Sequence, residues 1–218
     1  MLNITEAVIA IIAVNAFVDW NSQLHLNKSK PAGDAIGTAS IVLKRTATRI
    51  GRLLTSIDQN SFFRVGLRLY HGWHRGYAPT SNRKAITAAI SATDFSTLSA
   101  YPNISFKEQV GYGDTLLSAM PSRIHPGKSI HLPNTFRTKD GIDIEKMVDT
   151  ALASDMLYTA FTDPKDWILV VAEDDDHVPA IYTAEAAIAG HQSKIRLVHG
   201  LNRSNNFLML NEISVREK

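Results

Sequence analysis

Four aspartates stand where elements of secondary structure are expected to begin or end. Asp19 follows a long apolar run, Asp149 lies near the start of a helical pattern, and Asp174 and Asp176 follow the apolar run 167–172. Carboxylates that meet at one place repel one another unless cations neutralise them, and hard divalent ions take oxygen ligands. A Mg²⁺ or Mn²⁺ site of this kind can cleave a phosphodiester, so the four residues predict a nuclease in which each is both catalytic and metal-binding.

These carboxylates can come together only if the chain folds as a layered α/β unit. Hydrophobic patterns predict strands within 7–18, 61–70, 104–111, 167–172 and 194–199, and helices at 39–55, 80–92, 142–159 and 180–190. Strands that alternate with helices predict a mostly parallel sheet with helices on both faces. Parallel strands end at one edge of the sheet, where open α/β sheets bind ligands, so Asp19 and Asp174 are expected to be neighbours.

The connecting segments are less regular. Residues 21–23 and 28–37 are expected to be loops, and 206–213 is a last apolar segment. The proline-containing stretch 112–140 has little periodicity and many basic residues, which suits a long functional loop or a small β-excursion inserted in a single domain.

The composition describes an ordinary globular chain of 218 residues, with 44% hydrophobic and 20% charged residues. A net charge of +2 is too small to make the whole molecule a polyanion binder, so any attraction for RNA must come from local basic clusters. The absence of cysteine excludes disulfides and thiolate zinc sites, and suits a cytoplasmic protein. The apolar run 7–18 is shorter than the roughly 20 residues needed to cross a bilayer, so no membrane partner is expected. The oligomeric state is left open, with a homodimer among the options.

Basic and aromatic residues supply candidates for substrate binding. Arg45, Arg49 and Arg52 share one face of the helix predicted at 39–55, which is either a solvated face or a phosphate-contacting one. The segment after the second strand combines rings that could stack on bases with cationic groups that could pair with phosphates. The candidates for substrate contact are Asn21, Lys146, Arg45, Arg49, His71, Trp73, His74 and Arg75.

The segments around the four aspartates resemble a known family. Val18–Asp19 after an apolar run, KMVDTALASDM from Lys146 and ILVVAEDDDHVP from Ile168 are similar to the NYN family of PIN-like ribonucleases, including its bacterial LabA-like branch. The resemblance implies a three-layer α/β/α PIN-like sandwich, a divalent-metal site and RNA cleavage, with Asp19, Asp149, Asp174 and Asp176 as the matching acids.

The chain departs from the family pattern at three positions near these acids. Met147 and Glu173 each stand where the pattern has glycine, and His177 stands where it has phenylalanine. Two further aspartates are expected outside the ligand set. Asp155 lies about 240° around the helix from Asp149, and Asp175 should point away from its neighbours if the segment is extended, because alternate side chains share a face.

Three functions follow from these residues. The first is a metal-dependent endoribonuclease, and the alternative is a non-catalytic RNA- or protein-binding module that keeps the PIN-like fold. A phosphatase with Asp19 as nucleophile is disfavoured, because enzymes similar to the haloacid dehalogenases have a second aspartate where this chain has Asn21.

Overall fold

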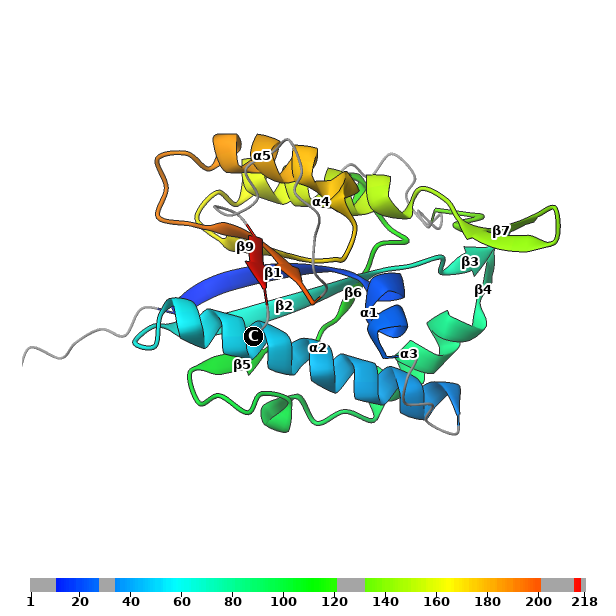
Figure 1. Cartoon of the computed structure of the whole chain (residues 1–218), viewed down its shortest axis with the longest axis horizontal. Helices are drawn as coiled ribbons and strands as arrows, with labels where there is room; N and C mark the ends of the chain where they lie inside the picture. The colour runs from blue at the N-terminus through cyan, green and yellow to red at the C-terminus, as the bar shows by residue number, and fades with distance from the viewer. Residues whose placement is uncertain (1–10, 28–33, 121–131, 201–213, 217–218) are drawn as a thin grey trace, which may run out of the picture.

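The computed structural model describes residues 11–27, 34–120, 132–200 and 214–216, and its centre is a parallel β-sheet (Figure 1). The strands of this sheet are β1 (Ile11–Asp19), β2 (Phe62–Tyr70), β5 (Ile104–Phe106), β6 (Gly111–Tyr112), β9 (Trp167–Val171), β10 (Ile195–His199) and β11 (Ser214–Arg216). Their order is β11–β10–β9–β1–β2–β5, with β6 also paired to β2. All these pairings are parallel.

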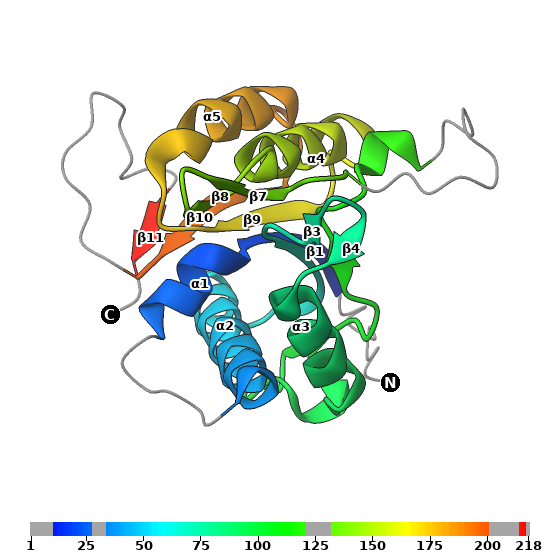
Figure 2. The same cartoon turned by 90° about the vertical axis from the view of Figure 1, so that its right-hand side faces the viewer.

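Helices cover both faces of the sheet (Figure 2). On one face lie α1 (Trp20–Leu26), α2 (Ala35–Ile57) and α3 (Ser81–Ser91), and on the other lie α4 (Val148–Thr162) and α5 (Val178–Ala187). Successive residues of a strand face opposite sides, so Ala16 of β1 packs in the hydrophobic cluster with α2, whereas Phe17 packs in the cluster with α4. The predicted α/β class with a mostly parallel sheet is confirmed.

Short elements complete the described chain. They are the 3-10 turns η1 (Phe95–Thr97), η2 (Leu117–Ala119) and η3 (Asp175–His177), and two antiparallel hairpins, β3 (His74–Arg75) with β4 (Ala78–Pro79) and β7 (Phe136–Lys139) with β8 (Ile142–Glu145). Among the described residues, no helix is both long and apolar enough to cross a membrane. The first part of the run 7–18, residues 121–131 of the long loop and the apolar segment 206–213 lie outside the described residues.

The helix predicted at 142–159 is wrong in its first part, because residues 142–145 form strand β8. The turn between β7 and β8 contains Asp140 and Gly141, which have φ of 54° and 77°. Two consecutive residues with positive φ build the tight turn that matches the twist of a hairpin, and Asp-Gly is a preferred pair for it. Helix α4 begins only at Val148 and ends at Thr162.

The loop predicted at 21–23 is also wrong, since these residues belong to helix α1. Asp19 ends β1 and caps α1, because its side chain accepts hydrogen bonds from the backbone N–H groups of Asn21 and Ser22. Helix α2 likewise begins earlier than predicted, after the cap residue Asp34. The strand predicted at 104–111 is divided into β5 and β6. Polar caps therefore mark these helix starts more reliably than apolar periodicity does.

Met147 has a left-handed backbone, with φ of 64°, immediately before α4. This conformation costs an L-residue roughly 1–2 kcal/mol and is accessible to glycine without that cost. We therefore expect Met147→Gly to stabilise the protein by about 1 kcal/mol, which corresponds to a rise of about 2–4 °C in Tm for a chain of this size. Thermal unfolding followed by circular dichroism measures this change.

Met120 supplies the matched control for this substitution. It is also exposed, but its φ is −64°, so Met120→Gly removes the same side chain without relieving a left-handed conformation. An equal or larger rise in Tm for Met120→Gly would show that the backbone at Met147 is not strained.

Candidate functional site

Acidic residues gather at the carboxyl edge of the sheet, where β1 and β9 end side by side. Val18 pairs with Val171 in parallel register, so Asp19 and the acidic turn after β9 leave neighbouring strands at the same edge. Asp149 lies in the first turn of α4, which packs against both β1 and η3. Segments that are far apart in the sequence therefore bring carboxylates to one place.

Asp19 is held in a fixed position at this edge. The residue is 8% exposed, and its Oδ1 accepts hydrogen bonds from the backbone N–H of Asn21 at 3.1 Å and of Ser22 at 3.3 Å. Burial raises the pKa of Asp19, and the charge of Glu145 adds to this, whereas the hydrogen bonds from Ser22 and the proximity of His177 lower it. The carboxylate is therefore oriented by the backbone and destabilised by its surroundings.

Asp149 is more accessible, with 60% of its side chain exposed. Partial burial is the largest cause that raises its pKa, and the charges of Asp174, Glu145 and Asp176 raise it further, whereas His177 opposes them. These carboxylates therefore lie near enough to one another to repel.

The aspartates after β9 form a tight turn. Asp174 accepts a hydrogen bond from the backbone N–H of Asp176 at 3.0 Å and caps η3. Asp175 was expected to point away from Asp174 and Asp176 if the segment were extended, but it begins the 3-10 turn η3 and lines the same cleft as Asp174. The residues follow a 3-10 turn instead of an extended strand, so the rule of alternating faces does not apply to them. Asp176 is exposed beside them.

A cleft of about 690 Å³ opens at this edge. This volume lies within the range of about 300–1,000 Å³ that is typical of small-ligand sites. The cleft is lined by Asp19, Asn21, Ser22, His25, Leu26, Glu173, Asp174 and Asp175. Asn21 was predicted to contact substrate and does line this cleft.

The site matches a hard divalent cation in chemistry but not in the present side-chain positions. Carboxylate oxygens are the donors that Mg²⁺ and Mn²⁺ take. However, in the described part of the chain no three His, Asp or Glu side chains lie close enough together to hold one ion. The exposed side chains of Asp149, Asp174 and Asp176 would have to rotate toward the fixed carboxylate of Asp19.

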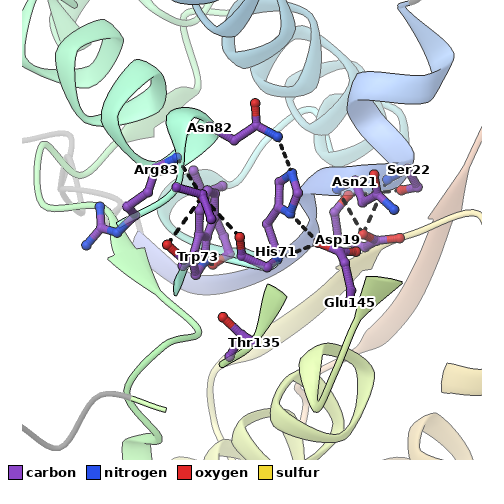
Figure 3. A network of polar contacts seen from close by, with 12 residues as sticks. Asp19, Asn21, Ser22, His71, Trp73, Asn82, Arg83, Thr135 and Glu145 are labelled. Carbon is purple, nitrogen blue, oxygen red and sulfur yellow. Dashed lines mark hydrogen bonds and ion pairs between the residues drawn. The ribbon is translucent and has the colours of Figure 1, made fainter. Parts of the chain in front are cut away.

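Glu145 belongs to this edge although it was not among the residues predicted for the site. Its Oε1 contacts His71 Nδ1 and accepts a hydrogen bond from the backbone N–H of Gly72, and Asn82 Nδ2 lies 2.7 Å from the other ring nitrogen of His71 (Figure 3). Glu145 raises the pKa of both Asp19 and Asp149. The Asp-Gly turn before β8 was the available signal, because it places Glu145 at the end of a strand.

His177 is the second residue that the sequence analysis missed as a contributor. It is 1% exposed, and neither of its ring nitrogens has a hydrogen-bond partner among the described residues. Its Nε2 lies 3.9 Å from Asp149 Oδ1. The chain therefore has an imidazole at the position where the resemblance noted from the sequence led us to expect the apolar ring of phenylalanine.

Most of the segment predicted to stack on bases is part of the core. Trp73 is fully buried and donates its indole N–H to the carbonyl oxygen of Leu69, so its ring is not available to a base. His71 and His74 are also buried. Arg75 is half exposed, but it forms an ion pair with Asp143 at 2.9 Å. Aromatic residues after a strand can complete the core as readily as they can bind a ligand.

Lys146 and the arginines of α2 have different surroundings. The Lys146 side chain is exposed two residues before α4. Arg45 and Arg49 line a separate pocket beside α1. Arg49 was predicted either to be solvated or to contact phosphate. Its side chain is only 9% exposed and forms an ion pair with Glu173 at 3.5 Å, so it is not solvated and it already has an acidic partner.

The fold and the site define a class, an α/β protein with an acidic cleft at the carboxyl edge of a parallel sheet. Comparisons with protein-family models, curated proteins and solved structures find no match to this chain.

Proposed function

We propose that the protein is a metal-dependent endoribonuclease of PIN-like architecture that hydrolyses RNA phosphodiesters at the carboxyl edge of the sheet through Asp19 and Asp174, which line the cleft, and Asp149 and Asp176, which lie outside its lining. One observation carries the proposal. Three separate parts of the chain, the end of β1, the start of α4 and the turn after β9, bring carboxylates to one edge of the sheet. The raised pKa of Asp149 reflects their mutual repulsion as well as its partial burial.

The four aspartates would have different roles at the metal site. Asp19 is fixed by backbone N–H groups and would give the site its rigid ligand. Asp149, Asp174 and Asp176 are exposed and can turn toward a bound ion. Mg²⁺ or Mn²⁺ bound there would supply the Lewis acid and the activated water for hydrolysis. Asn21 and Ser22 line the cleft and offer polar groups to the RNA backbone.

A cleavage assay tests this function. We expect the protein to cut labelled single-stranded or structured RNA in Mn²⁺, to lose activity in EDTA, and to lose at least about 100-fold in rate in the variant Asp174→Asn. Substitution of a residue that hydrogen-bonds to a metal ligand already lowers metal affinity or activity by about 10–100-fold, and removal of the ligand itself should lower activity at least as much. A DNA strand of the same sequence measures the preference for RNA.

Asp163→Asn is the control for this assay. Asp163 is exposed at the opposite end of α4, so its substitution makes the same chemical change outside the site. Equal cleavage by Asp174→Asn and by the unmodified protein would remove Asp174 from the catalytic site, and no cleavage in any divalent metal would contradict nuclease activity.

The alternative is a non-catalytic RNA- or protein-binding module with the same fold. One observation favours it, namely that no three described acidic or histidine side chains are close enough to share an ion as they stand. Binding of RNA in EDTA at the affinity seen in Mn²⁺, without cleavage in either condition, would support this alternative.

A further inference from the structure

A second pocket lies beside the acidic cleft and has the opposite charge. We call it the arginine pocket, and its volume is about 380 Å³. It is lined by Gln23, Leu26, Asn27, Arg45, Thr46, Thr48, Arg49, Arg52 and Gly200. The described lining therefore contains three guanidinium groups and no carboxylate. Arginine is the side chain best suited to bind phosphate oxygens through several hydrogen bonds at once.

The arginine pocket is held in shape by hydrogen bonds around its wall. Arg45 donates to Asn27 Oδ1, and Asn27 Nδ2 donates to the carbonyl oxygen of Gln23 at 2.7 Å. Arg49 donates to Gln23 Oε1 at 2.6 Å, and Gln23 is 1% exposed. Gly200 closes the wall, because a Cβ atom there would stand 3.1 Å from Arg49 Nη2. The guanidinium groups of Arg45 and Arg49 are thus ordered before any ligand binds.

Thr46 provides a second and independent sign of a ligand. It lines the arginine pocket and is 1% exposed, and its hydroxyl has no hydrogen-bond partner among the described residues. A buried hydroxyl without a partner is unfavourable by about 1–3 kcal/mol. Helical threonines commonly bond the carbonyl of the preceding turn, but the Thr46 hydroxyl makes no such bond in the described chain. It is therefore available to donate to an anion held by the arginines.

The arginine pocket and the acidic cleft share a wall. Leu26 lines both, and Arg49 on one side pairs with Glu173, which lines the cleft on the other. Glu173 Oε1 also accepts a hydrogen bond from the backbone N–H of Gly200 at 2.7 Å. A polyanionic strand whose phosphate lies at the acidic cleft could therefore place another phosphate in the arginine pocket.

We propose that the arginine pocket, through Arg45, Arg52 and the Thr46 hydroxyl, binds a phosphate group of the nucleic acid strand that enters the cleft. This use of the pocket rests on the proposed function, but phosphate binding itself requires neither metal nor cleavage. The phosphate is either one inside the strand or the one at its 5′ end, and the experiment separates these two sources.

The test measures binding in EDTA, so that cleavage does not interfere. Inorganic phosphate is titrated calorimetrically, and the anisotropy of a labelled oligoribonucleotide is followed with either a 5′-phosphate or a 5′-hydroxyl. We expect Arg45→Gln/Arg52→Gln to weaken phosphate binding about tenfold or more, because two charged hydrogen-bond donors to the anion are lost. A loss confined to the 5′-phosphorylated strand identifies a terminal phosphate, and an equal loss for both strands identifies an internal one.

Two further variants make the result specific. Lys44→Gln/Lys84→Gln removes the same charge from exposed positions that do not line the arginine pocket, and should leave phosphate binding unchanged. Thr46→Val removes only the buried hydroxyl, so we expect weaker phosphate binding with an unchanged or higher Tm. This variant tests the pocket even if the double arginine variant folds poorly.

The inference is overturned if the arginine variants bind phosphate as the unmodified protein does, or if the lysine variant loses as much affinity. It is also independent of the outcome for catalysis. Asp174→Asn should abolish cleavage and keep phosphate binding, so a protein that binds phosphate in the arginine pocket without cutting RNA would contradict only the nuclease.

Discussion

Asp155→Asn is expected to destabilise the protein by about 3–5 kcal/mol, the usual cost of removing one partner from a buried ion pair. Asp155 is fully buried in α4, and its Oδ2 accepts hydrogen bonds at 2.8 Å from both Arg68 Nε and the Tyr70 hydroxyl. Its other oxygen accepts from the backbone N–H of Leu117 at 2.7 Å. One carboxylate therefore joins α4 to β2 and to the η2 turn.

The size of this effect follows from the charge that the substitution leaves behind. The Arg68 side chain is only 13% exposed, so without Asp155 its guanidinium would stay largely buried and lack its counter-ion. An asparagine oxygen can still accept hydrogen bonds from Arg68 and Tyr70, but it carries no charge. Burial and the charge of Asp155 also raise the pKa of Tyr70 well above its ordinary value, so the phenol remains a donor.

Urea denaturation measures this prediction, with two variants for comparison. Asp163→Asn makes the same change at the exposed carboxyl-terminal end of the same helix and should shift stability by less than about 0.5 kcal/mol. The double variant Asp155→Leu/Arg68→Met removes both charges and should recover much of the loss, since apolar replacement of a buried pair is often close to neutral. Stability of Asp155→Asn within about 1 kcal/mol of the unmodified protein would show that the ion pair contributes little.

The placement of the acids could be predicted because it depends on chain order and strand ends. Once the strand around Val18 and the strand 167–171 are parallel, the residues that follow them must share an edge, whatever the details of packing. The positions of Asp19 and Asp174 could therefore be predicted from the apolar runs and from the rule that ligands bind at the carboxyl ends of the strands in α/β sheets. Helical geometry likewise predicted that Asp155 lies outside the ligand set, since about 240° around α4 separates it from Asp149.

What the sequence could not show depends on contacts between distant segments. Trp73 was predicted to stack on bases, but it is buried by α3 and β6, which come later in the chain and pack against its ring. Its local sequence does not show this burial. Glu145 was not recognised because it lies in a segment predicted to be helical. His177 contributes to the site because its ring lies near Asp149, and the sequence alone does not show this proximity. The arginines of α2 looked like one uniform stripe, although Arg49 is tied to Glu173 from a distant part of the chain.

Asp149→Asn is expected to have opposite effects on stability and activity. Without metal, the Asp149 carboxylate is partly buried and repelled by Asp174, Glu145 and Asp176, and these effects outweigh the attraction of His177. The start of α4 favours a negative charge by about 0.3–1 kcal/mol, which reduces the gain but does not remove it. We therefore expect the substitution to raise the Tm of the metal-free protein by about 1–2 °C.

The pH dependence of this gain follows from the direction of the shift. The folded state holds a proton on Asp149 more readily than the unfolded state does, so the charged carboxylate weakens the fold at neutral pH. As the pH falls through the raised pKa toward the ordinary value of 3.8, the carboxyl group becomes neutral in both states and the difference between the two proteins should disappear. A stability difference that grows below about pH 4 would contradict this account.

Metal is expected to reverse the order of the two proteins. Under the proposed function Mn²⁺ binds the folded acid cluster and not the unfolded chain, so it should raise the Tm of the unmodified protein, whereas the variant lacks one proposed ligand and should respond less. RNA cleavage by the variant should fall at least about 100-fold for the same reason. Differential scanning calorimetry with and without Mn²⁺ and the cleavage assay together test one cause, because repulsion in the absence of metal and binding in its presence come from the same carboxylate. A variant that is more stable without metal but still shows the full Mn²⁺ shift would place the ion away from Asp149.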